Sequence, residues 1–330
     1  MPKSLAVRAA LRRAAIAFAA ASFLAAAACA AALLLAAVDP CRAAEEARAP
    51  LGYQILEAAG GSFTVYYPSD RAKLARETAR LLEESAGAIA GELGLETIDP
   101  VKVVIASDQK TFELLHRGAI PEWGIAFANV ETRMLGVNAD LVAREPREFS
   151  TVVRHELSHL LLAQRIEGVP MPTWFMEGLA IVQSGEWDFS DEWRFTTTAG
   201  RREIPYLEEL RGAFPRSSDG AVLAYGMSYF AVRRLLDERP GSLITLTAFV
   251  RDEGDFEGGF ESAFGRTAYD FSGRLYVEID RRYRAPGAIL NAAPYWALGA
   301  LLFVAVFLIK RARSLRKLER WEREEREGRG

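Results

Sequence analysis

The chemistry of this 330-residue chain centres on its histidines, of which there are only three. Two of them stand in the run His155-Glu156-Leu157-Ser158-His159, inside a stretch with helical periodicity. Residues i and i+4 lie one above the other on a helix, so both imidazoles point to one side. Paired imidazoles are suitable ligands for one tetrahedral zinc, and Glu156 projects toward the same cleft. The run therefore predicts one zinc per chain, with Glu156 as the general base on a metal-bound water. The alternative is an exposed helix whose two histidines bind no metal.

A catalytic zinc needs a third protein ligand. His116 precedes the motif on a separate predicted helix, and we interpret it as a surface or cap residue. Glu177 is the better candidate, because it lies 18 positions after His159 (177 − 159) in the run PTWFMEGLA. That separation lets the first helix end, the chain turn and a second helix return beside it, with Gly178 and Ala180 allowing close approach. The alternative for Glu177 is a solvated helix carboxylate.

These two motifs together resemble the gluzincin clan of zinc metallopeptidases, and most closely the bacterial peptidase MA-like domains. The resemblance continues over Ala224–Gly241 and Phe256–Ile279, and it covers roughly Gly61–Arg284. It implies a zincin-like α+β fold with a small N-terminal sheet and a helical C-terminal part. It also implies that His155, His159 and Glu177 bind zinc and that Glu156 acts as the base on a peptide or protein substrate.

The sequence departs from the resemblance at two places. Thermolysin-like enzymes carry an Asp one turn after the glutamate ligand to orient a histidine, and this chain has Ile181 there. We expect the orienting group to come from elsewhere, for example a backbone carbonyl. The donor to the developing oxyanion is not specified by a motif. Tyr225 is our candidate for it, ahead of Tyr229 on the same predicted helix face, although buried core tyrosines are the more common case.

An uncharged segment near the N-terminus, Ala14–Val38, follows four basic residues and no acidic one. Its 25 residues fit a signal peptide and are also long enough to span a bilayer. We therefore expect residues 1–44 to be a signal peptide or a signal anchor. Cys29 and Cys41 are the only cysteines, so the body is expected to be held by packing without disulfides.

A second uncharged segment, Ala288–Ile309, is 22 residues long and is followed by a cluster of basic residues. The length and the flanking charges predict a transmembrane helix at residues 286–309 and a charged cytoplasmic tail at 310–330. Residues 45–285 would then be an extracytoplasmic domain of a protein of the bacterial cell membrane. The protein would be single-pass, or two-pass if the first segment is not cleaved, and it would contact membrane lipid.

The part of the chain between the two apolar segments has most of its strand patterns in its N-terminal half and mostly helical patterns in its C-terminal half. Strands are predicted at 61–67, 101–106, 124–128 and 134–142, helices at 71–93 and 108–115, and a mostly helical pattern after residue 147. This order indicates an α+β domain and not an alternating parallel sheet. The predicted strand Met134–Val142, just before the histidine helix, is expected to pair with an extended substrate.

Composition excludes some classes and leaves three functions open. Hydrophobic residues make up 50% of the chain and charged residues 26%, which excludes a disordered polymer. With a net charge of −3 we expect no nucleic acid partner. The leading prediction is a membrane-anchored zinc metallopeptidase. The alternatives are a catalytically inactive zinc-stabilised binding or scaffold module at the cell surface, and a membrane-anchored structural protein without a metal.

Overall fold

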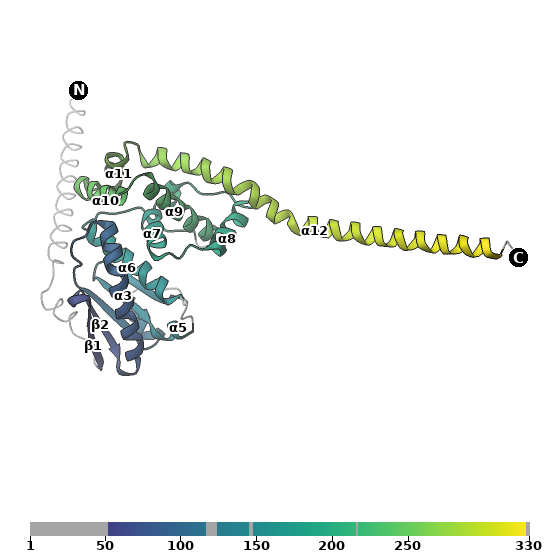
Figure 1. The fold of residues 1–330 in the computed structure, drawn as a ribbon. Coiled ribbons are helices and arrows are strands. Elements are labelled where there is room, and N and C mark those ends of the chain that lie inside the picture. Colours follow the sequence, from purple (N-terminus) through teal and green to yellow (C-terminus); the bar gives the residue numbers. More distant parts are fainter. Residues whose placement is uncertain (1–51, 117–123, 145–147, 216, 328–330) are drawn as a thin grey trace, which may run out of the picture. The chain divides into compact units, whose positions relative to one another are not determined.

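A computed structural model describes residues 52–116, 124–144, 148–215 and 217–327 (Figure 1). Side chains are described within these ranges except at 293, 294 and 312–327. The apolar segment Ala14–Val38 and both cysteines lie outside the described residues, so their predictions are not addressed. From Gln54 on, the described residues form one compact unit. This unit contains the sheet, apart from the first residue of its first strand, and all the helices discussed below.

The N-terminal part is built on a five-stranded sheet with the order β1-β2-β3-β5-β4. The strands are β1 Tyr53–Ala58, β2 Phe63–Pro68, β3 Val101–Ala106, β4 Ala126–Asn129 and β5 Met134–Asn138. The central pairs β2–β3 and β3–β5 are parallel, and β4 runs antiparallel to β5. A small N-terminal sheet followed by helices confirms the α+β prediction. The parallel pairing of its central strands was not anticipated from the sequence.

Helix α3, Ala72–Leu93, makes the parallel pairing of β2 and β3 possible, because parallel neighbours need a crossover connection. Its buried residues recur at helical spacing, among them Leu82, Ile89 and Leu93. The helix ends at Gly94, whose φ of 69° gives the left-handed conformation of a C-cap. Helix α3 packs against β2 and against α6, Phe149–Arg165, so these two helices cover the sheet together (Figure 1).

Strand β5 is shorter than predicted, and it is not available to a substrate. It ends at Asn138, because the Asn138 Oδ1 accepts hydrogen bonds from the amides of Asp140 and Leu141 at 3.1 and 3.2 Å. This side chain starts α5, Ala139–Arg144. Strand β5 also lies between β3 and β4, so both of its edges are already paired. The prediction that this strand pairs with substrate is therefore wrong, and β4 is the outermost of the described strands on this side of the sheet.

The rest of the described structure is mostly helical. Helix α4, Gln109–His116, lies between β3 and β4 in the sequence. The helices after α6 are α7 Thr173–Ser184, α8 Phe189–Ala199, α9 Ser218–Glu238, α10 Ser242–Glu253, α11 Phe256–Phe264 and α12 Ala268–Glu327. Helices α7 and α9 pack closely at Gly178, where an added Cβ would lie 2.2 Å from the Ser228 carbonyl oxygen. Gly178 therefore serves the contact of α7 with α9, and not the contact with the histidine helix that the sequence suggested.

Helix α12 joins the folded body to the apolar segment without a break. Its first part packs on α8, where the Asn291 Nδ2 donates to the Thr197 carbonyl at 2.8 Å. From Tyr295 to Ile309 its large apolar side chains are exposed, with Trp296 at 75% and Phe303 at 74%. Within the described residues, α12 is the one helix long and apolar enough to cross a membrane. The domain boundaries at 285 and 309 remain predictions.

The close approach at Gly178 generates a test of the packing of α7 on α9. We expect Gly178→Ala to lower the free energy of unfolding by about 1–3 kcal/mol, because the new methyl meets a backbone carbonyl that cannot move aside. Gly273→Ala in α12 is the control, since nothing lies within 4 Å of its added Cβ. That control should be neutral or stabilising by roughly 0.5 kcal/mol. Urea denaturation of the two variants measures both effects, and an unchanged Gly178→Ala variant would contradict the packing.

Candidate active site

Two helices bring the three predicted metal ligands together. Helix α6 carries His155 and His159, and α7 carries Glu177. The Nε2 atom of His155 lies 3.5 Å from Oε2 of Glu177, and Nε2 of His159 lies 3.8 Å from Oε1 of the same carboxylate. Donor atoms of the three residues all lie within 4.8 Å of one another, and all three side chains are partly buried. The sequence separation of 18 positions thus accommodates the returning helix that was expected.

The buried face of α6 fixes the direction in which its histidines point. Val153, Leu157 and Leu161 are fully buried in the core. Ser158 is also buried, and its hydroxyl donates to the Gln183 Oε1 of α7 at 2.7 Å. Gln183 in turn donates to the Glu92 carboxylate of α3 at 2.9 Å. These hydrogen bonds join three helices beside the site, so they fix the position of α7 relative to α6.

Helix α7 is held at both ends. Pro172 is its N-cap residue, with an extended backbone, and the Thr173 hydroxyl donates to the Arg211 carbonyl at 3.2 Å. Trp174 and Phe175 in its first turn are buried with edge-on ring contacts. At the other end Gly185 takes a left-handed conformation, φ 70°. The chain therefore turns sharply there, and the next residue lies next to the histidines.

That next residue, Glu186, is the site residue that sequence reasoning missed. Its Oε2 lies 2.9 Å from the Nδ1 of His155 and also accepts from the Ser184 hydroxyl at 3.3 Å. A carboxylate at Nδ1 holds the proton on that nitrogen and leaves Nε2 free as a ligand. The orienting group is thus a side chain and not the backbone carbonyl we suggested. The signal in the sequence that could have identified it is an acidic residue directly after Gly185, the glycine that ends the helix.

The charges of these groups depend on one another. Burial alone lowers the pKa of His155, but hydrogen bonds with Glu177 and Glu186 and the charges of Glu186 and Glu156 raise it to about 10. Burial alone would raise the pKa of Glu177, but the hydrogen bond from His155 and the charges of both histidines lower it. Burial, with the charge of His155 adding, lowers the pKa of His159. The site therefore favours a positive charge between its carboxylates.

The donor set fits zinc. Two imidazole nitrogens and a carboxylate are a known ligand set for a catalytic zinc, and ligands of one tetrahedral ion stand about 3.4 Å apart. The two histidines lie 3.5 and 3.8 Å from different oxygens of Glu177, and with one donor atom per residue the set lies within 4.8 Å, so the donors stand somewhat wider apart than around a bound ion. Because the pocket stabilises a proton on His155, a divalent cation can take the place of that proton. His116 is not one of these donors, and its ring lies edge-on against Phe127 with centroids 4.8 Å apart.

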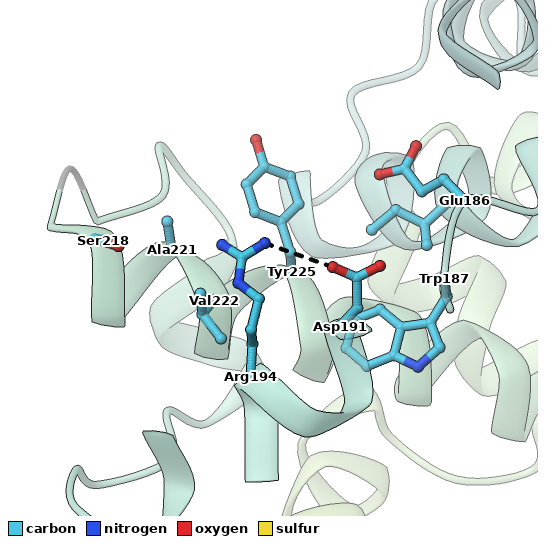
Figure 2. Close-up of a pocket in the computed structure, with 9 residues that line it drawn as sticks. Glu186, Trp187, Asp191, Arg194, Ser218, Ala221, Val222 and Tyr225 are labelled. Atoms are coloured by element: carbon cyan, nitrogen blue, oxygen red, sulfur yellow. Dashed lines mark ion pairs between the residues drawn. The ribbon is translucent and has the colours of Figure 1, made fainter. Parts of the chain in front are cut away.

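We call His155, His159 and Glu177 the candidate ligand triad. The other residues predicted to act at the site are Glu156, Tyr225 and Tyr229. Glu156 is partly buried on α6, and its charge acts on both histidines. Tyr225 of α9 is 41% exposed, and burial together with nearby carboxylates raises its pKa to about 12. Tyr229 stacks on Trp187 with ring centroids 4.6 Å apart, which is a packing role. Tyr225 and Glu186 line the same cavity (Figure 2).

The bond between Glu186 and His155 predicts a role in metal affinity. We expect Glu186→Gln to weaken zinc binding by roughly 10- to 100-fold, because the amide no longer fixes the His155 ring as a charged acceptor does. The matched control is Glu83→Gln, an exposed carboxylate on α3 that bonds the Ala59 amide. Competition with a fluorescent chelator measures both affinities. Equal affinity in the two variants would show that Glu186 does not support the ligand.

The raised pKa of His155 sets the sign of the pH dependence of metal binding. Below its pKa of about 10 the free protein carries a proton on His155 that zinc must displace. Burial lowers the pKa of His159, so a proton on this residue competes less with zinc than it would on an exposed imidazole. Zinc affinity should therefore rise about tenfold per pH unit between about pH 6 and about pH 8, which titration at several pH values measures. A flat profile would contradict this protonation state.

Comparison with known protein families gives one match. The family described as the Peptidase MA superfamily matches residues 86–275, which is more than half of the chain. The matched region begins within α3, includes the whole of α6 and α7, and ends in α12. No curated protein matches the chain.

Proposed function

The chain belongs to the Peptidase MA superfamily, and we propose that it is a zinc-dependent metallopeptidase of the gluzincin type. The observation that carries the proposal is the convergence of three donors from α6 and α7, with the second nitrogen of one histidine already held by a carboxylate. In this proposal His155, His159 and Glu177 bind one zinc per chain. Membership of the superfamily supports a peptide or protein as the substrate.

Each nearby side chain has a defined task in the hydrolysis. A zinc ion bound by the triad would act as a Lewis acid toward the scissile carbonyl and toward water. Glu156 takes a proton from the attacking water and passes it to the leaving amine. The Tyr225 hydroxyl donates a hydrogen bond to the developing oxyanion, and its pKa of about 12 keeps it protonated at neutral pH. Glu186 holds the His155 ring in place.

The substrate backbone is expected to bind along β4. This strand is the outer strand on its side of the sheet, and it packs against α6, the helix that carries the histidines. An extended peptide can add to such an edge through main-chain hydrogen bonds without regard to its sequence. Strand β4 thus replaces β5 as the proposed substrate-pairing strand, for the reason given by the strand order.

We place the peptidase domain outside the cytoplasm of a bacterial cell. The support is the apolar, exposed surface of α12 up to Ile309 and the basic residues that follow it. In this topology the segment Ala14–Val38 exports the domain, and residues 310–330 stay in the cytoplasm. The inactive scaffold alternative is favoured by two departures from the resemblance, the missing orienting acid at position 181 and the unspecified oxyanion donor. The contact of Glu186 with His155 weakens the first of these grounds.

The proposed base is tested by a substitution that preserves the metal site. We expect Glu156→Gln to lower peptide hydrolysis by at least about 100-fold, because the amide cannot accept the proton, while one zinc per chain remains bound. The control Glu84→Gln changes an exposed carboxylate of α3 and should retain full turnover. Hydrolysis of a peptide library and metal analysis are the two measurements. Retained turnover in Glu156→Gln would contradict the base, and zinc binding by a wild-type protein without turnover would favour the scaffold.

A further inference from the structure

A cavity of 290 Å³ adjoins the ligand triad on the side of α8 and α9. It shares Glu186 with the site, because this carboxylate both lines the cavity and bonds His155. Figure 2 shows the Asp191 carboxylate in the middle of the lining, with Arg194 on one side and Trp187 on the other. The rest of the lining includes the aliphatic side chains of Ile181, Ala221 and Val222. This volume lies at the lower end of the range of ligand pockets and is large enough for one amino acid side chain.

The charges that line this cavity are unequal. Glu186 and Asp191 are two carboxylates, of which Glu186 already pairs with His155, and Arg194 is the single cation among the lining residues. Arg194 reaches Asp191 only loosely, with Nη1 3.7 Å from Oδ1, and its side chain is 59% exposed. Ion pairs this exposed contribute little, so a second cation can displace Arg194 at small cost. An anion would instead meet two carboxylates and a guanidinium that is already paired.

Two of the lining residues are harder to ionise than usual, and burial is the main cause in both. Burial raises the pKa of Asp191, the negative charges of Asp188 and Glu186 add to this rise, and the Asp188 amide and Arg194 oppose it. Burial also raises the pKa of the Tyr225 phenol, and the charges of Glu177, Glu186 and Glu156 add to it. Nearby carboxylates thus oppose a further negative charge at both residues. A cationic group entering the cavity would relieve this repulsion.

We propose that the cavity is a specificity subsite for a basic side chain, lysine or arginine, of the peptide substrate, and that Asp191 is the carboxylate that pairs with it. The apolar walls accommodate the methylene stem of such a side chain, and the charged end meets Asp191. In the free protein Arg194 pairs with Asp191, and the basic side chain of the substrate displaces Arg194 when it binds. This proposal rests on the proposed peptidase function, because the shared Glu186 puts the subsite beside the scissile bond.

The test compares peptides that differ at one residue near the scissile bond, with arginine, norleucine or glutamate there. For the zinc-loaded full-length protein we expect kcat/KM to be at least about tenfold higher for arginine than for norleucine. In Asp191→Asn this ratio should fall by about tenfold, while the amide oxygen can still cap the Asp188 amide. In Arg194→Met the ratio should rise, because the competing cation is gone. Asp237→Asn on α9, outside the cavity lining, is the control and should keep the wild-type ratio.

The same peptides are also titrated onto the zinc-loaded Glu156→Gln protein, so that binding is measured apart from turnover. Tighter binding of the arginine peptide that depends on Asp191, without hydrolysis by the wild type, would keep the subsite and reject the peptidase. Hydrolysis with no preference for arginine, or a preference that Asp191→Asn leaves intact, would overturn the subsite and keep the peptidase. An equal loss for all three peptides in Asp191→Asn would also overturn it, since that pattern indicates a structural role.

Discussion

The structure depends on the need to hold two carboxylates and two imidazoles together in one partly buried space. Glu177 and Glu186 contact the two ring nitrogens of His155 at 3.5 and 2.9 Å, and His159 lies beside them. Removing such charges from water is costly unless each finds a partner of opposite sign. A proton on His155 satisfies both carboxylates in the free protein. In the proposed function a divalent cation between the same donors would take the place of that proton.

The surrounding helices are arranged to keep these groups from separating. The hydrogen-bond series from Ser158 through Gln183 to Glu92 connects α6, α7 and α3. On its other side α7 presses against α9 at Gly178, where no side chain larger than hydrogen fits. Because protein interiors are closely packed, a shift of α7 would have to disturb both contacts at once. Glu177, the proposed third ligand, therefore lies on a helix that is held on both sides, as an accurate site requires.

The sequence predicted the parts of the site that depend on local spacing. The i, i+4 rule put His155 and His159 on one face of α6, and the capping and turn signals placed Glu177 on a returning helix. Glu186 was not predicted, because its position depends on the left-handed turn at Gly185 and on the angle between two helices. Neither of these is encoded in a short motif.

The same distinction applies to the sheet. Strands β2 and β3 followed from their β-branched and aromatic residues, within two residues of the predicted bounds. The neighbours of a strand are set by the crossover helices and by long-range packing, so the strand order was not accessible. That order is what moved the proposed substrate edge from β5 to β4. The end of β5 at Asn138 was also not predicted. The side chain of Asn138 caps the helix α5 that follows, and this competes with continuation of the strand.

Helix α8 contacts both the cavity beside the candidate site and helix α12, which carries the apolar segment. Its residues Asp191 and Arg194 line the cavity, and one turn further along Thr197 accepts the hydrogen bond from Asn291 of α12. Earlier in the same pair of helices the Tyr283 hydroxyl donates to the Glu192 carboxylate at 2.8 Å. The cavity wall is thus bonded to the helix whose exposed apolar part begins at Tyr295, only a few residues later. With α12 crossing a membrane as proposed, these bonds would link the cavity wall to this helix close to the start of the span.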